Sequence, residues 1–290
     1  MLGALMGDIM GSRYEGPGWL DDPQAAPLWS ADAQFTDDSV LTAAVAQWLL
    51  DGGALAYHLH GLGRRHLTRG FGQGFLTWLL TEPPGPAYQS WGNGAAMRVS
   101  PVAAWANTPE ELLILARASA LPTHDHVQGI RGAQAAAWAI RYAFENPHDS
   151  NALLSDIETR FGYRLAAFDP SAVRARGFEL ECEATVTSSV WAAAHGGSIE
   201  GAMRLILALG GDTDTMGAIA GPICEGLYGL SAETVAQLPR YFHPADGVWS
   251  TLARFYAHPR VAQRLATWGR LPPTPWPMAI GSPTLRLGRF

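Results

Sequence analysis

The residues best suited to chemistry follow a pair of glycines in the segment Gly210-Gly211-Asp212-Thr213-Asp214-Thr215, where two carboxylates and two hydroxyls stand together. Strongly apolar segments flank this cluster, and a carboxylate is costly to bury there unless a positive charge compensates it. A single Asp or Thr would be explained as a helix N-cap. Two carboxylates separated by one residue better suit a hard cation with oxygen ligands, so we favour metal ligation over capping.

A second segment of the same construction is Phe35-Thr36-Asp37-Asp38-Ser39, which leads directly into an apolar segment. Two such clusters on core helices could converge on one site, where four carboxylates would neutralise two divalent cations. Ligand sets made only of oxygen favour Mg²⁺ or Mn²⁺ over zinc. Asp8 and Glu15 offer further carboxylates. A structural hydrogen-bonding role explains Asp8 at least as well as metal ligation does.

Two further segments carry candidate ligand contacts. Gly92-Asn93-Gly94, followed by Met97 and Arg98, is on its own most typical of a tight turn. Alternatively, its backbone amides approach an anionic group, with Arg98 as a fork-shaped donor for phosphate. The segment Thr123-His124-Asp125-His126 could ligate a transition metal, but the carboxylate clusters favour hard cations, so we interpret His124 as a substrate contact. A capping or core histidine is the competing explanation.

The elements that must position these residues are mostly helices. Apolar residues recur at helical spacing in 40–50, after a helix start at Pro109, in 129–144, in 201–209 and in 216–227. Small residues in the last two segments indicate helices that approach closely. The best strand candidate, 183–190, also fits a helix entry. The pattern predicts an all-α protein.

Loops are predicted at 16–27, 83–94 and 146–151, where Gly, Pro and polar residues gather. From Pro259 onward Pro and Gly accumulate and the helical period is expected to disappear. We therefore predict one domain over 1–258 and a C-terminal tail over 259–290 that packs on the domain or extends from it.

Composition excludes several classes of function. The net charge of −6 and the absence of lysine, with all 20 cations being Arg, argue against direct nucleic-acid binding and against a P-loop or Schiff-base lysine. Two cysteines are too few for a disulfide framework, which favours a reducing compartment. We expect no signal peptide in 1–11, no membrane span, a cytoplasmic location, and, as the simplest state, a monomer.

Taken in order, these segments resemble the ADP-ribosylglycohydrolase family, the group of dinitrogenase-reductase-activating glycohydrolases and ADP-ribosylhydrolases. The resemblance spans about residues 1 to 250. The residues that carry it are Gly3-Ala4-Leu5-Met6-Gly7-Asp8 with Tyr14-Glu15, Phe35-Thr36-Asp37-Asp38-Ser39, Gly92-Asn93-Gly94 with Met97-Arg98 and Pro101, Ser119 with Thr123-His124, and Gly210-Gly211-Asp212-Thr213-Asp214-Thr215.

The resemblance implies a compact orthogonal multi-helix bundle with a dinuclear Mg²⁺ or Mn²⁺ centre in a cleft. It implies that Glu15 is an acidic residue on a loop over the metals and that Glu15 or Asp37 holds or deprotonates the attacking water. The implied metal ligands are Thr36, Asp37, Asp38, Asp212, Asp214 and Thr215. The implied contacts to the diphosphate and distal ribose are Gly92, Asn93, Gly94, Met97 and Arg98, and His124 is a further substrate contact.

The implied enzyme is a hydrolase of the glycosidic bond between ADP-ribose and its acceptor, with ADP-ribosyl-arginine on protein as the first choice. Serine-linked or small-molecule ADP-ribosyl compounds are alternative substrates. A non-catalytic ADP-ribose-binding protein and a different Mg²⁺-dependent phosphoesterase are alternatives from other classes. The chain departs from the pattern expected for the family at Gly16-Pro17-Gly18, Asp125-His126-Val127 and Thr187, which bears on acceptor specificity and leaves the metal ligands unchanged.

Overall fold

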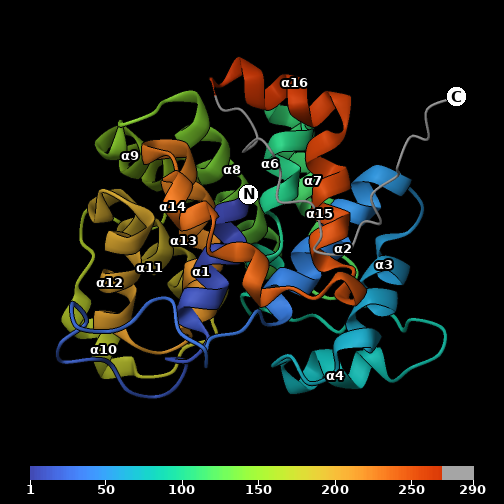
Figure 1. Ribbon diagram of the computed structural model, residues 1–290, viewed down its shortest axis with the longest axis horizontal. Coiled ribbons are helices and arrows are strands. Elements are labelled where there is room, and N and C mark those ends of the chain that lie inside the picture. The colour runs from blue at the N-terminus through green and yellow to red at the C-terminus, as the bar shows by residue number, and fades with distance from the viewer. Residues whose placement is uncertain (270–290) are drawn as a thin grey trace, which may run out of the picture.

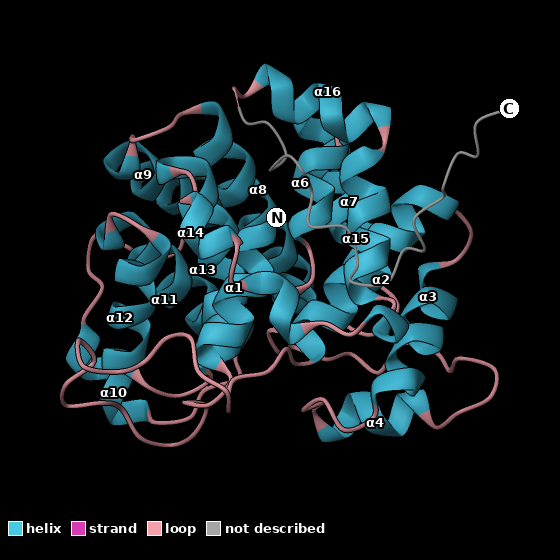
Figure 2. Ribbon diagram, viewed as in Figure 1, coloured by secondary structure: helices cyan, strands magenta, loops and turns pink. Residues whose placement is uncertain are grey.

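Helices dominate the computed structural model, which describes residues 1–269 (Figures 1 and 2). In that range no named strand occurs, and extended pairing is limited to two isolated bridges, Gly16 with Gly211 and Gly92 with Glu181. The predicted all-α, multi-helix fold is confirmed. No helix among the described residues has the length and apolar character needed to cross a membrane.

The α-helices are α1 (Leu2–Gly11), α2 (Asp37–Asp51), α3 (Leu55–Gly63), α4 (Gln73–Leu79), α5 (Gly94–Met97), α6 (Ser100–Trp105), α7 (Pro109–Ala120), α8 (Val127–Glu145), α9 (Ser150–Phe161), α10 (Pro170–Arg176), α11 (Cys182–Gly196), α12 (Ile199–Leu209), α13 (Thr213–Tyr228), α14 (Ala232–Val235), α15 (Val248–Ala257) and α16 (Pro259–Thr267). Short 3₁₀ helices cover Arg64–His66, Leu238–Tyr241 and Pro244–Asp246. The five helices predicted from apolar spacing correspond to α2, α7, α8, α12 and α13.

The central packing is between α1 and α13, which lie side by side in Figure 1. Glycines at four-residue spacing bring the two backbones together. A Cβ on Gly7 would lie 1.9 Å from the carbonyl oxygen of Gly217, and one on Gly3 would lie 2.2 Å from that of Gly221. Helices α8, α11 and α12 pack against α13, so that α1 and α13 form the middle of the core. This close approach brings Asp8, on α1, near Asp214 in the first turn of α13.

The strand candidate at 183–190 is wrong as a strand, because the whole segment lies inside α11. Its several Thr and Ser residues make the alternation of polar and apolar side chains compatible with either a strand or the start of a helix. The hydroxyls of Thr185 and Ser189 donate hydrogen bonds to carbonyl oxygens four residues earlier, at 3.0 and 2.8 Å. These bonds satisfy the polar groups within the helix and leave its apolar side chains free to pack.

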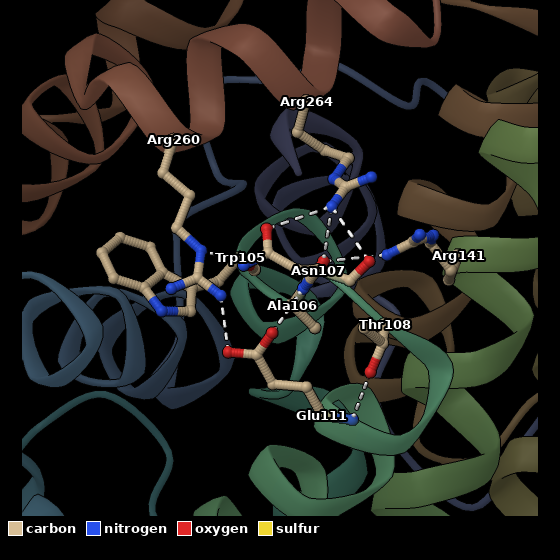
Figure 3. A network of polar contacts seen from close by, with 8 residues as sticks. All are labelled: Trp105, Ala106, Asn107, Thr108, Glu111, Arg141, Arg260 and Arg264. Atoms are coloured by element: carbon tan, nitrogen blue, oxygen red, sulfur yellow. Dashed lines mark hydrogen bonds and ion pairs between the residues drawn. The ribbon is translucent and has the colours of Figure 1, made fainter.

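The expectation that helical structure ends at Pro259 is also wrong, since α16 runs from Pro259 to Thr267. Two arginines fasten this helix to the turn after α6 (Figure 3). Arg260 donates to the carbonyl of Trp105 at 2.6 Å and pairs with Glu111 at 2.5 Å. Arg264 donates to the carbonyl of Ala106 at 3.1 Å. The predicted division into a domain and a tail stays a prediction, because 270–290 lie outside the described residues.

Candidate metal centre and substrate cleft

The two carboxylate clusters lie at the N-termini of α2 and α13, and the structure brings them together. Thr36 is the N-cap of α2, where its hydroxyl accepts a hydrogen bond from the backbone N–H of Asp38. Asp212 stands at the N-cap position of α13, yet its side chain makes no capping hydrogen bond. Capping therefore accounts for Thr36 but not for Asp212. The partial positive charge at both helix starts favours the clustered carboxylates.

Two groups of three carboxylates are close enough to share a cation. Oxygens of Asp8, Asp38 and Asp214 lie within 4.8 Å of one another, and so do oxygens of Glu15, Asp212 and Asp214. Asp214 is common to both groups, so its carboxylate could contribute to a cation held by either group. Asp37 belongs to neither group, although it lines the same cleft.

The buried carboxylates of these groups repel one another, and a nearby positive charge would stabilise them. Burial, followed by the negative charges of Asp8 and Asp37, raises the pKa of Asp38 well above its ordinary value. Burial and then Asp212 and Asp38 raise the pKa of Asp214 in the same way. Among the described residues, the buried Oδ1 of Asp38 has no hydrogen-bond partner. Repelling buried carboxylates with an unpartnered oxygen fit the oxygen-ligand chemistry of divalent cations.

Asp8 has a structural role as well as a place beside the candidate cations. Its carboxylate accepts hydrogen bonds from the backbone N–H and hydroxyl groups of Thr36 and Ser39, including 2.7 Å from the Thr36 hydroxyl. Burial raises the pKa of Asp8 to about 6, while these bonds act in the opposite direction. Asp8 thus joins α1 to the first turn of α2, which confirms its structural hydrogen-bonding role, and cation ligation by Asp8 stays a prediction.

Asn93 is tied to the second cluster. Its side-chain amide donates to Oδ2 of Asp212 at 2.7 Å and to the Thr185 hydroxyl at 3.2 Å. Its backbone N–H donates to the carbonyl of Leu180 at 3.1 Å. The Gly-Asn-Gly turn therefore orients a candidate metal ligand, a relationship that the sequence did not reveal. A contact between Asn93 and the ligand stays a prediction.

Glu15 lies at the exposed edge of the site, on the segment that follows α1. The backbone N–H of Gly16 donates to the carbonyl of Gly211 at 3.0 Å, which holds Glu15 beside Asp212. The turn at Gly210 needs glycine, because its φ is +76° and a Cβ there would lie 2.1 Å from the carbonyl oxygen of Gly18. Burial, then Asp212 and Asp8, raises the pKa of Glu15.

A cleft of about 360 Å³ opens over these carboxylates. Every predicted site residue except Thr36 lines it, and Thr36 lies behind the carboxylates in contact with Asp8 and Asp38. Sequence reasoning missed ten further lining residues; the glycine-rich run around Phe71 could have indicated those at 70–75, and no local signal marked the other five. The missed lining residues are Leu41, Gly70, Gly72, Gln73, Gly74, Phe75, Tyr88, Ser90, Phe178 and Leu180.

The cationic side of the cleft is formed by Arg98, whose side chain is 0% exposed. Its Nη2 group donates to the carbonyl of Ser119 at 2.8 Å and to the Thr123 hydroxyl at 2.9 Å. Nε and Nη1 have no hydrogen-bond partner among the described residues. His124 lies beside it, 4% exposed, with its ring centroid 6.4 Å from that of Tyr88. Direct contact of Arg98 with a phosphate stays a prediction.

Comparison with known proteins gives one consistent result. Residues 1–270 match the family model described as ADP-ribosylglycohydrolase. The chain is 25% identical over 306 aligned residues to the human ADP-ribosylhydrolase ARH3, covering 79% of this chain and 84% of that protein. It is 23% identical over 340 residues to the mouse protein of that name, covering 88% and 90%.

A solved structure is also similar. It is titled "ADP-ribosylglycohydrolase-related protein complex" and superimposes with a TM-score of 0.65 at 25% identity. The superposition covers 88% of this chain and 95% of the other. The similarity therefore extends over most of the helical bundle.

Proposed function

The chain belongs to the ADP-ribosylglycohydrolase family, and from this premise we propose that it is a Mg²⁺- or Mn²⁺-dependent hydrolase of the bond between ADP-ribose and its acceptor. Membership of the family supports hydrolysis of ADP-ribosyl compounds. The observation that carries the cation dependence is the pair of carboxylate groups that share Asp214 at the floor of the cleft. ADP-ribosyl-arginine on protein is the acceptor linkage we place first.

The chain's own carboxylates would hold the cations. Asp38 and Asp214, with Asp8 behind them, offer oxygens to one ion, and Glu15, Asp212 and Asp214 offer oxygens to the other. Thr215 is placed to contribute, since its hydroxyl lies 3.4 Å from Oδ2 of Asp38. When bound, such a cation pair supplies Lewis-acid polarisation and orients substrate oxygens.

Glu15 and Asp37 are the candidate proton acceptors. Hydrolysis adds water at the anomeric carbon of the distal ribose while the bond to the acceptor breaks, through an oxocarbenium-like state. Burial and the neighbouring carboxylates raise the pKa of both carboxyls, and the positive charge of bound cations would act in the opposite direction and keep them ionised, as a proton acceptor must be. Glu15 is the more exposed of the two.

The part of the cleft lined by Arg98, Tyr88 and His124 suits the nucleotide portion of ADP-ribose. Arg98 brings positive charge beneath it, and Tyr88 and His124 supply ring surfaces to its wall. Gly92 and Gly94 keep the wall free of side chains, and Met97 adds an apolar contact. The diphosphate would then lie near Arg98 and the distal ribose near the carboxylates.

The proposal also includes an ADP-ribosylated protein or small-molecule substrate, a monomeric state, a cytoplasmic location and no direct nucleic-acid partner. The net charge of −6 supports the last point, because DNA and RNA binding depends on cationic surface. Serine-linked and small-molecule ADP-ribosyl compounds are the alternative substrates.

The test is release of ADP-ribose from arginine-ADP-ribosylated protein, with and without EDTA, followed by add-back of Mg²⁺ or Mn²⁺ and identification of the product. We expect cation-dependent release of intact ADP-ribose. Asp212→Ala should abolish release while the circular dichroism spectrum is unchanged, and Glu110→Ala, on the exposed face of α7, is the control. Full activity of Asp212→Ala would contradict the proposal.

Two other outcomes decide between the alternatives. Release of ADP-ribose from serine-linked or small-molecule substrates, but not from arginine, would replace arginine as the proposed acceptor. The proposed hydrolysis of the ADP-ribosyl bond would stand. Tight binding of ADP-ribose without release from any of the three linkages would identify a reader, and release of phosphate would identify a phosphoesterase.

A further inference from the structure

We infer that Thr123, held by Arg98, is a positioning residue that fixes the imidazole of His124 with its proton on Nε2 and presents that N–H to the bound ligand. The inference rests on the proposed function for the identity of the ligand, ADP-ribose. It assigns a role to two buried groups, the Thr123 hydroxyl and the Arg98 guanidinium, that the carboxylate chemistry does not use.

The contacts form a continuous chain of hydrogen bonds. Nη2 of Arg98 donates to Oγ1 of Thr123 at 2.9 Å, and that hydroxyl lies 2.7 Å from Nδ1 of His124. The side chains of Arg98 and Thr123 are 0% exposed, and that of His124 is 4% exposed. The backbone N–H groups of Thr123 and His124 both donate to the carbonyl of Ala120, at 3.1 and 2.8 Å. Backbone and side chains therefore hold the group rigidly.

Proton accounting decides the tautomer. An arginine guanidinium only donates hydrogen bonds, so Oγ1 of Thr123 accepts the bond from Arg98. The Thr123 hydroxyl still has its own proton to place, and a buried donor without an acceptor is costly. Nδ1 of His124 is the one acceptor that the described part of the chain supplies for it. Nδ1 therefore accepts, and a neutral ring then carries its proton on Nε2.

The surroundings of the ring agree with a neutral imidazole. Burial, and then the positive charge of Arg98, lowers the pKa of His124 well below its ordinary value. A neutral ring with a fixed tautomer is a hydrogen-bond donor at one defined position. It differs in this respect from an imidazolium, which would donate from both nitrogens and could not accept from Thr123.

The donor edge faces the cleft wall at Gly94. A Cβ on Gly94 would lie 3.0 Å from both Nε2 and Cε1 of His124, so the glycine leaves this edge open. Within the described residues, the structure gives Nε2 no hydrogen-bond partner. The ligand group recognised here is consequently a hydrogen-bond acceptor, an oxygen or an unprotonated ring nitrogen of ADP-ribose.

The experiment compares Thr123→Val, which removes the hydroxyl at nearly constant volume, with Thr123→Ser, which keeps it. In protein labelled with ¹⁵N-histidine, His124 of the parent should show a pyridine-like Nδ1 shift and a pyrrole-like Nε2 shift, assigned by their loss in His124→Asn. Thr123→Ser should keep that signature and Thr123→Val should lose it. Thr251→Val, a buried hydroxyl removed from α15, controls for general loosening of the core.

Calorimetric titration with ADP-ribose in the presence of Mg²⁺ supplies the second readout. Thr123→Val should weaken the Kd roughly tenfold, which corresponds to one hydrogen bond, and Thr123→Ser should restore it. A parent His124 protonated at Nδ1, or a Thr123→Val variant with unchanged ¹⁵N shifts and unchanged Kd, would overturn the inference. The ¹⁵N readout needs no ligand, so absence of ADP-ribose binding by the parent would sink the proposed function without deciding the tautomer.

Discussion

The carboxylate of Asp8, in the middle of α1, accepts hydrogen bonds from both the backbone N–H and the hydroxyl of Thr36, the N-cap of α2. This relationship ties the central helix to the start of the helix that carries Asp37 and Asp38. The Thr36 hydroxyl donates to Asp8 at 2.7 Å and accepts from the backbone N–H of Asp38 at 3.4 Å, so it joins the two carboxylate-bearing residues. The position of the carboxylates at the start of α2 is therefore set by a residue of the central helix α1.

Asp8→Asn tests that relationship. An amide nitrogen cannot accept the bonds that Thr36 and Ser39 now donate, so the first turn of α2 should shift. We expect Mn²⁺ affinity, measured by calorimetric titration, to fall about 10- to 100-fold, as is typical when a group that orients metal ligands is removed. Asp32→Asn, at a carboxylate that is 81% exposed, is the control. Unchanged Mn²⁺ affinity in Asp8→Asn would show that Asp8 orients nothing of consequence.

Removal of divalent cations should lower thermal stability. Cations that bind the folded carboxylates and not the unfolded chain stabilise by mass action, about 2.7 kcal/mol at a free concentration 100-fold above Kd. Adding Mg²⁺ or Mn²⁺ to EDTA-treated protein should therefore raise Tm by several degrees in differential scanning calorimetry. Asp214→Asn removes the carboxylate shared by both groups and should abolish most of this rise. An equal rise in the variant would contradict the assignment.

Gly94→Ala should weaken ligand binding with little effect on the fold. Gly94 has no positive φ, so its backbone accepts alanine, but the new methyl group would lie 3.0 Å from Nε2 of His124. We expect the Kd for ADP-ribose to rise roughly tenfold, equivalent to one lost hydrogen bond, with Tm nearly unchanged. Gly61→Ala, whose Cβ would meet nothing within 4 Å, provides the comparison. Wild-type affinity in Gly94→Ala would mean that the ligand does not use this edge of His124.

Gly7→Ala should destabilise the whole fold. The added Cβ would lie 1.9 Å from the Gly217 carbonyl oxygen, so α1 and α13 would have to separate. Overpacking of this kind lowers the free energy of unfolding by about 1–3 kcal/mol. Because the clash here is with a backbone carbonyl, which cannot rotate away as a side chain can, we expect the upper end of that range. Urea unfolding followed by circular dichroism measures the change. Gly61→Ala, in an exposed part of α3, should be neutral or stabilising, and the same result for Gly7→Ala would show that α1 and α13 are not in close backbone contact.

Arg260→Ala should loosen α16 from the turn after α6. The Arg260–Glu111 pair is partly exposed, so we expect a loss of about 1 kcal/mol in the free energy of unfolding at neutral pH. Burial raises the pKa of Glu111, but the backbone N–H of Asn107 and then Arg260 together lower it by more, giving a net pKa below the ordinary 4.5. The stabilisation is thus present above pH 4.5 and lost as pH falls through the lowered pKa.

The difference between Arg260→Ala and the parent in urea unfolding should therefore shrink in acid. Arg117→Ala, at an exposed position of α7, should leave stability within about 0.5 kcal/mol of the parent at every pH. A constant difference between Arg260→Ala and the parent across the acid range would assign the effect to packing of the Arg260 side chain rather than to the ion pair.

The sequence by itself determined the class of fold, and it predicted oxygen-ligand chemistry at the carboxylate clusters. Apolar spacing in segments such as 40–50 and 216–227 is a local property, since residues three and four apart share a helix face whatever surrounds them. Carboxylates crowded at 36–38 and 212–215 indicated cations for an equally local reason, their mutual repulsion and the cost of burying them. The absence of lysine excludes whole classes of enzyme, because their chemistry requires an amine that this chain does not have.

Tertiary structure alone decided which residues act on one another. The bonds from Asn93 to Asp212 and from Asp8 to Thr36 join residues 119 and 28 positions apart, and no local pattern encodes such pairs. Whether Arg98 meets ligand directly or through Thr123 depends on its burial, which is a property of the packed core. The helix α16 was missed for the same reason. It is held by contacts to the turn at 105–107, and the local sequence of a Pro-containing segment gives no sign of those contacts. The spacing of apolar residues determines where the helices form, and the residue types determine which groups can donate or accept hydrogen bonds. Packing of the helices determines which of these groups come into contact.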